Sequence, residues 1–210
     1  MRKQLHAMLS GARRRQSGFN LMELMVALAV AGMLLGLAVP NFREFIRNSR
    51  LTSASNDLLA SIQLARNEAV KRQLPVAVCA TSSPNASPPV CNGGAFTAWV
   101  VWVDADNDWV IDNVAAEPVL SRQQALHNTL TVRTDNNGRV KYQPIGFLAP
   151  ASGGITPSTR VVICDERGLN TSIGASAARA IEIAPTGRAR VTRVHADVEN
   201  ALAIINAGCP

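Results

Sequence analysis

The sequence lacks the short motifs by which common catalytic sites are recognised. It contains no Gly-x-Ser-x-Gly, no His-Glu-x-x-His, no Cys-x-x-Cys and no glycine-rich phosphate-binding loop. Hydrolases, zinc sites and nucleotide-binding enzymes need those residue types at those spacings. The three histidines stand isolated from one another and from every cysteine. We therefore expect a protein that is not an enzyme and that needs no cofactor.

Acidic residues are absent from residues 1–18, which hold five Lys/Arg. The whole chain carries a formal net charge of +6, so the rest of the chain has 16 Lys/Arg against 15 Asp/Glu, or +1. Once the N-terminal segment is set aside, overall basicity is no argument for nucleic-acid binding. Only local clusters of charge remain to be considered.

A long apolar run follows this basic segment, from Phe19 to Val39. As a helix it would be roughly 30 Å long, which matches the hydrocarbon core of a bilayer. The positive-inside rule leaves the basic N-terminus in the cytoplasm and places the residues after Val39 outside. The sequence predicts a single pass through the inner membrane with a periplasmic head.

One acidic residue, Glu23, interrupts the apolar run, at a cost of about 2.5 to 3.5 kcal/mol. Cleavage before Phe19 would create an α-amino group that a neighbouring copy could present to this carboxylate. The segment resembles the type IV prepilin signature at five positions: Gly18, Phe19, Leu21, Glu23 and Leu24. The resemblance implies that prepilin peptidase cleaves after Gly18, that Phe19 is N-methylated and that Glu23 serves assembly. Asn20 and Met22 depart from the usual residues without altering the glycine or the glutamate.

Other interpretations of this segment explain less of it. A secretory signal could use Ala29-Val30-Ala31 as a cleavage site, but its apolar core would be shorter and would hold no carboxylate. Arg14-Arg15 could belong to a twin-arginine signal, to which the same objection applies. A plain single-pass anchor would explain neither Gly18 nor Glu23.

The periodicity predicts an α+β fold with a long N-terminal helix packed on a β-rich head, and the resemblance to the prepilin signature implies that this fold is type IV pilin-like. We expect a leader over 1–18, a helix over 19–73 whose half 19–39 spans the membrane, and a head over 74–210. The second half of the helix carries an apolar stripe at spacings of three and four: Leu51, Ala54, Leu58, Ile62, Ala65 and Ala69. Pro40 would bend this helix without having to end it.

The head shows short β-rich runs separated by turn residues. Strands are predicted over 76–81, 96–103, 118–120, 129–134, 139–143, 160–164, 179–184 and 188–192. Asn137-Gly138 is typical of a two-residue β-hairpin turn. The segments 85–89, 149–157 and 170–178 are predicted to be loops.

All four cysteines follow the membrane segment, in a compartment that oxidises thiols. Of the three possible pairings we favour Cys79 with Cys91, which closes a short loop, and Cys164 with Cys209, which ties down the C-terminal tail. Metal binding is the weaker interpretation, because no histidine accompanies these cysteines.

Four aspartates match part of a calcium-loop spacing: Asp104, Asp106, Asp108 and Asp112. Trp109 stands where such a loop needs glycine, and Ala115 stands where it needs a bidentate glutamate. We therefore prefer a solvated acidic turn and predict no metal site, with these aspartates as the only candidates.

A basic cluster lies near the C-terminus, at Arg188, Arg190 and Arg193, with Arg179 before it. On a strand Arg188 and Arg190 point to one face, roughly 7 Å apart, which is comparable with phosphate spacing. The alternative is an ordinary solvated strand face. No Phe, Tyr or Trp follows Phe147, so contacts would be to phosphates rather than by base stacking.

The order of the head resembles the GspH/FimT family of minor pilins and pseudopilins. The resemblance rests on VVWVDADND, on Gly146-Phe147, on VVICDERG and on RAIEIAPTGRARV. In the FimT branch a Gly-Arg-x-Arg element is associated with DNA binding in natural transformation, and Gly187, Arg188 and Arg190 fall on it. The resemblance implies a minor pilin that joins other pilins in a type IV pilus and binds double-stranded DNA without sequence preference. The alternative is a minor pseudopilin of a type II secretion system.

Overall fold

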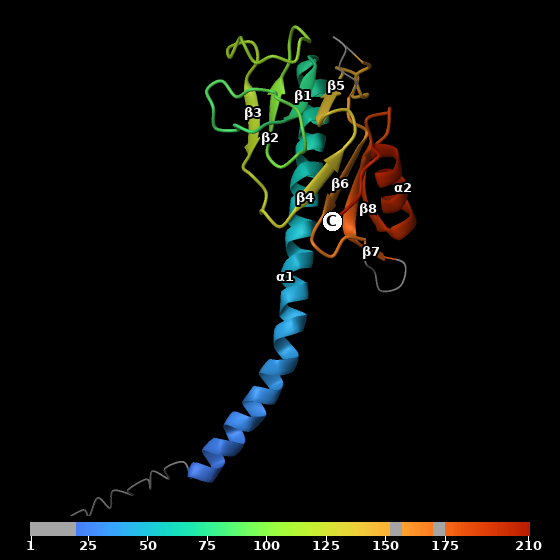
Figure 1. Cartoon of the computed structure of the whole chain (residues 1–210). Coiled ribbons are helices and arrows are strands. Elements are labelled where there is room, and N and C mark those ends of the chain that lie inside the picture. Colours follow the sequence, from blue (N-terminus) through green and yellow to red (C-terminus); the bar gives the residue numbers. More distant parts are fainter. Residues whose placement is uncertain (1–19, 152–156, 170–174) are drawn as a thin grey trace, which may run out of the picture. The chain divides into compact units, whose positions relative to one another are not determined.

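The computed structural model describes residues 20–151, 157–169 and 175–210. The chain divides into two compact units, Met1–Glu44 and Phe45–Pro210. The elements follow in the order α1, β1 to β8, α2 (Figure 1). The three hydrophobic core clusters of the described residues all lie within the second unit, so residues 45–210 carry their own core.

The described part of the first unit belongs almost entirely to α1, which extends from Leu21 to Arg72. Its large apolar side chains are exposed, and Leu21 and Leu37 are both 73% accessible. Among the described residues α1 is the one helix long and apolar enough to cross a membrane, judged by length and composition. The helix continues through position 40, as the sequence predicts.

In the second unit, the later part of α1 buries the apolar stripe that the sequence predicts. All six positions are at most 3% exposed: Leu51, Ala54, Leu58, Ile62, Ala65 and Ala69. They belong to one core cluster with side chains from both β-sheets. The three alanines on this stripe let the sheets approach the helix closely. Burial of an apolar stripe, rather than helix propensity, is what stabilises such a helix in a folded head.

The strands form two four-stranded sheets, and all strand pairs among the described residues are antiparallel. The first has the order β3-β2-β1-β5, with bounds Val119–Gln123, Trp99–Val103, Val76–Ala80 and Arg139–Tyr142. The second has the order β4-β6-β7-β8, with bounds Thr131–Thr134, Arg160–Cys164, Ala175–Ile183 and Ala189–Val194.

Each sheet is covered on both faces, which explains the continuous apolar runs of the central strands. One face of each sheet packs on α1. The other face of the first sheet packs beneath the segment 104–118, through Trp109 and Ile111. The other face of the second sheet packs on α2, the helix His195–Ile205 (Figure 1). All five residues of β1 and of β2 are therefore buried.

All eight predicted strands are present, with small differences in their bounds. The largest difference is in β7, which begins at Ala175 within the segment 170–178 that was predicted to be a loop. The ladder with β8 shifts register between Ala175 and Ala180, and this irregularity hides the strand from a simple alternation pattern.

The predicted β-hairpin at Asn137-Gly138 is wrong. Both residues do adopt a positive φ, of 59° and 62°, but the flanking strands do not pair with each other. β4 pairs with β6, and β5 pairs with β1, so the turn connects the two sheets. A Cβ on Gly138 would lie 1.9 Å from the Gly94 carbonyl oxygen, which explains the glycine at this position.

The helix α2 was not predicted. Its signal is present in the sequence, since Val198, Ala201, Leu202 and Ile205 follow a helical spacing and pack on the second sheet. Asn206 ends the helix in the left-handed conformation, at φ 55°, and its backbone N–H donates to the last turn.

Candidate nucleic-acid interface

The basic cluster lies on a hairpin formed by β7 and β8, whose turn is closed by Gly187. The Gly187 N–H donates to the Ala184 carbonyl at 2.8 Å, and the Ala184 N–H donates to the Arg188 carbonyl at 2.9 Å. Gly187 has φ 80°, and a Cβ there would lie 2.1 Å from the Gly146 carbonyl oxygen. Only glycine fits this turn without a backbone shift. Gly187 therefore positions the arginines that follow it.

Two long side chains hold this turn in place. The Tyr142 hydroxyl donates to the Gly187 carbonyl at 3.1 Å, and burial raises the pKa of Tyr142 well above its usual range. Arg66 of α1 donates from Nε to the Gly146 carbonyl at 3.0 Å and from Nη2 to the Thr186 carbonyl at 3.3 Å. Neither residue is predictable from the sequence, because each acts on a backbone carbonyl far along the chain.

Arg188 and Arg190 lie on the same side of the hairpin and are both exposed. The Arg188 side chain has no hydrogen bond or ion pair with any residue in the described parts of the chain. Arg190 forms an ion pair with Glu182, its partner across the β7–β8 ladder, with an N–O distance of 2.6 Å. The hydrogen bond and charge of Glu182 raise the pKa of Arg190. The two arginines therefore differ: one is unpaired and the other is neutralised.

An open pocket of about 680 Å³ brings a third arginine to these two. Arg160, the first residue of β6, lines it together with Arg188, Arg190 and Glu182. Arg160 is not among the residues predicted from the sequence. An isolated arginine at the start of a strand carries no signal until the strand order is known.

Arg179 and Arg193 lie elsewhere. They line a separate depression of about 500 Å³ with residues of α1, including Asn48 and Thr52. Arg193 is three residues after Arg190 on β8, so its side chain points to the opposite face of the sheet. Arg179 donates from Nη1 to the carbonyls of residues 176–178. The predicted set of four arginines is therefore split into two pairs on opposite faces.

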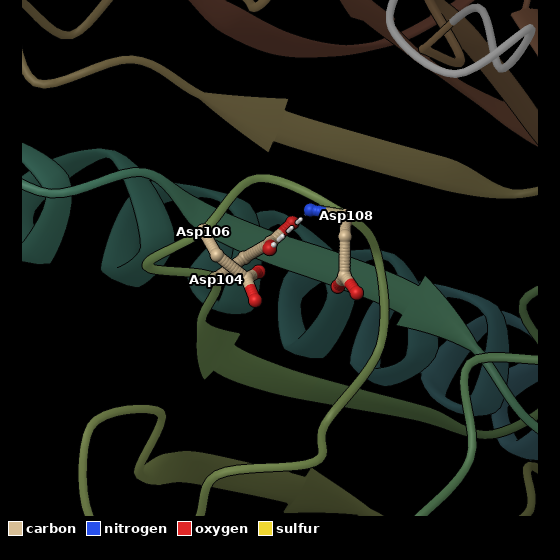
Figure 2. A group of neighbouring side chains, drawn as sticks. All are labelled: Asp104, Asp106 and Asp108. Carbon is tan, nitrogen blue, oxygen red and sulfur yellow. Dashed lines mark hydrogen bonds between the residues drawn. The ribbon is translucent and has the colours of Figure 1, made fainter.

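The acidic segment after β2 has a different role from the one expected. Asp104 is fully buried and accepts the N–H groups of Asp108 and Trp109 through Oδ1, at 3.1 and 3.5 Å. Figure 2 shows the bond from Asp108 to Asp104. Oδ2 of Asp104 forms an ion pair with the buried Lys141. The preferred interpretation of a solvated turn is therefore wrong for Asp104, although Asp106, Asp108 and Asp112 are exposed.

Lys141 takes the place that a cation would need beside Asp104. Its ammonium lies 3.9 Å from the ring centroid of Trp109 and donates to Asn107 Oδ1 at 2.9 Å. Trp109, which stands where a calcium loop needs glycine, has φ 71°. Carboxylate oxygens lie within 4.8 Å of one another in two groups, Asp104–Asp106–Asp108 and Asp106–Asp112–Glu117. Asp104, the buried member of the first group, already forms an ion pair with Lys141 through Oδ2.

Both disulfides that the sequence analysis favours are present. Cys79 is bonded to Cys91, with 5.5 Å between Cα atoms, and Cys164 is bonded to Cys209, with 5.7 Å between Cα atoms. The second bond joins β6 to the segment after α2. Glu23 lies in the first turn of α1. The proposed cleavage site at Gly18 and Phe19 lies outside the described residues.

Comparison with known proteins gives matches along most of the chain. A family model described as type II transport protein GspH matches residues 54–187. A second model, the prokaryotic N-terminal methylation motif, matches residues 13–39. A type IV major alpha-pilin from Moraxella bovis is 40% identical over 45 residues, which make up 21% of this chain and 28% of that protein. The chain thus matches under a third of the length of this curated relative.

Two crystal structures of the type IV minor pilin FimU from Pseudomonas aeruginosa also match. One has a TM-score of 0.46 at 18% identity and covers 70% of this chain and 91% of that one. The other has a TM-score of 0.44 at 20% identity and covers 67% and 91%. The family assignment rests instead on the GspH model, which matches more than half of the chain, and on the methylation motif at the N-terminus. The chain belongs to the GspH family of minor pilins and pseudopilins.

Proposed function

We propose that this chain is a minor pilin of a type IV pilus, whose head binds double-stranded DNA through the backbone phosphates during natural transformation. Processing by prepilin peptidase and assembly with other pilins follow from the family. In this proposal the inner membrane holds the subunit before assembly, with its N-terminus in the cytoplasm and its head in the periplasm.

One observation carries the proposal of DNA binding. Arg188 is exposed and unpaired at the rim of an open pocket that also holds Arg190 and Arg160. Guanidinium groups donate two parallel hydrogen bonds to phosphate oxygens, and such contacts do not depend on base sequence. None of the described residues that line the pocket is aromatic, which agrees with backbone contacts rather than base stacking.

The alternative is a minor pseudopilin of a type II secretion system. The description of the matching family model favours it. In that case the same pocket would contact another pseudopilin or a secreted protein. The N-terminal motif is common to pilins and pseudopilins, so it does not distinguish the two functions.

DNA binding by the head separates the two functions. The fragment 45–210 avoids the five cations of residues 1–18, which would bind DNA by themselves. We expect micromolar or weaker affinity for a duplex of random sequence, with little change between sequences. Arg188→Gln with Arg190→Gln should flatten the plot of log K against log salt by about one to two units. Fluorescence anisotropy measures both quantities.

The control is Arg50→Gln, which removes one exposed arginine that lines a different pocket. It should leave the salt dependence within about half a unit of the wild type. Unchanged binding by the folded double variant would show that the arginines form only a solvated strand face. No binding by the wild-type head at low salt would favour the secretion pseudopilin.

A further inference from the structure

Arg160, Glu182 and Arg190 form a row of alternating charge across three neighbouring strands. Arg160 of β6 is the register partner of Glu182 on β7, and Glu182 is the register partner of Arg190 on β8. Side chains at paired positions of an antiparallel sheet point to the same face. The pocket that contains Arg188 is lined by all three. The central carboxylate could therefore pair with either arginine.

Glu182 pairs with Arg190 in this structure. Glu182 Oε2 accepts from Nε of Arg190 at 2.8 Å and lies 2.6 Å from its Nη2. The Glu182 side chain is 20% exposed, whereas that of Arg190 is 63% exposed. A phosphate that approaches Arg190 therefore meets a guanidinium whose charge is already compensated. Its attraction for that phosphate is reduced accordingly.

Arg160 is in the opposite situation. Its Nη1 donates to the Thr159 hydroxyl at 3.2 Å, but its Nε is shielded from solvent and has no hydrogen-bond partner among the described residues. The nearby carboxylate of Asp135 is engaged elsewhere: it accepts the backbone N–H groups of Thr159 and Arg160 and the Thr159 hydroxyl. A buried donor without an acceptor is a position that an oxyanion would satisfy.

We propose that Arg160 and Arg188 are the two phosphate-binding arginines of this pocket and that Glu182 suppresses the contribution of Arg190. The ligand class is the phosphodiester backbone of a nucleic acid, so this inference rests on the proposed DNA-binding function. The family element Gly-Arg-x-Arg contains only one of these two arginines. The other comes from a strand that lies 28 residues earlier in the chain, which tertiary folding alone brings into place.

The test is a set of salt titrations of the head 45–210 with a fluorescent duplex of random sequence. Each phosphate contact adds about 0.9 to the slope of log K against log salt. Arg188→Gln and Arg160→Gln should each flatten the slope by about 0.9, and Arg190→Gln combined with Glu182→Gln, which removes the ion pair, by less than half of that. Arg160→Lys should restore the slope, because it keeps the charge.

The acidic residue supplies the sharper test. Glu182→Gln should steepen the slope by about 0.9, and adding Arg190→Gln to it should remove that gain. Glu199→Gln makes the same chemical change on the exposed surface of α2 and should have less than half of that effect. The thermal unfolding midpoint of each variant shows that the head remains folded.

The outcomes separate the inference from the function on which it rests. If the wild-type head binds DNA but Arg190→Gln combined with Glu182→Gln costs a full contact and Arg160→Gln costs nothing, the inference is overturned and DNA binding stands. If the wild-type head binds no DNA, the proposed function fails. Inorganic pyrophosphate then tests the pocket alone: a shift of the Arg160 Nε–H resonance in NMR would support it as a phosphate site, and no shift would overturn it.

Discussion

The ammonium of Lys141 and the carboxylate of Asp104 form an ion pair in which both side chains are fully buried. Lys141 comes from β5 and Asp104 directly follows β2, so the pair fixes the start of the segment 104–118 against the first sheet. Burial lowers the pKa of Lys141, and the Asp104 carboxylate acts in the opposite direction. This internal cation has consequences that can be measured.

Lys141→Met should destabilise the head by about 3 to 5 kcal/mol, because it leaves the Asp104 carboxylate buried without a partner. Combining it with Asp104→Asn should recover part of this loss, since the uncompensated charge is then gone. Urea unfolding of residues 45–210 gives both free energies. A double variant less stable than the single variant would contradict the role assigned to the pair.

The pH dependence of stability should contain a contribution from Glu117. Burial raises the pKa of this carboxyl above its ordinary 4.5, and the Asp106 carboxylate acts in the same direction. The folded state therefore binds the proton more tightly than the unfolded state. The stability that protonated Glu117 contributes is complete below pH 4.5 and is lost as the pH rises through the raised pKa.

Glu117→Gln should remove that fall in the free energy of unfolding. Urea unfolding of residues 45–210 between about pH 4 and about pH 7 would measure the difference from wild type. Glu199→Gln, at an exposed position on α2, is the matched control and should follow the wild-type curve. Parallel curves for wild type and Glu117→Gln would show that this carboxyl does not carry the effect.

Gly187→Ala should cost at least about 2 kcal/mol, because the residue has a positive φ and the added Cβ would collide with the Gly146 carbonyl. DNA binding should weaken as well, since the turn positions Arg188. Gly208→Ala is the control: nothing lies within 4 Å of its added Cβ, and we expect a change within about 0.5 kcal/mol. Equal stability of the two variants, measured by thermal unfolding, would refute the turn argument.

Cleavage and assembly should separate genetically in the full chain. Gly18→Glu should leave a longer, unprocessed protein in the membrane, because we propose that the peptidase cleaves after this glycine. Glu23→Ala should be processed but should fail to enter filaments, since it removes the carboxylate that we propose compensates a neighbour's α-amino group. Immunoblots of membrane and sheared-filament fractions measure both. Normal processing of the first variant or normal assembly of the second would argue against the prepilin interpretation.

Local patterns in the sequence determined much of this fold. The spacing of Leu51, Leu58 and Ile62 predicts the buried stripe of α1 because an α-helix repeats every 3.6 residues. Eight short β-rich runs predict eight strands, since alternation and turn residues are local signals. The disulfide pairs could be favoured because four cysteines allow only three pairings, and one of these closes a short loop and ties down the C-terminal tail.

The tertiary structure decided the rest, because strand order and side-chain partners depend on contacts between residues distant in the chain. Asn137-Gly138 has the residues of a hairpin turn, yet the strands beside it belong to different sheets. Lys141 gave no sign in the sequence that it would neutralise Asp104. The arginine cluster was visible, but only the order β6-β7-β8 places Arg160 beside it and makes Glu182 the partner of one arginine and not of the other.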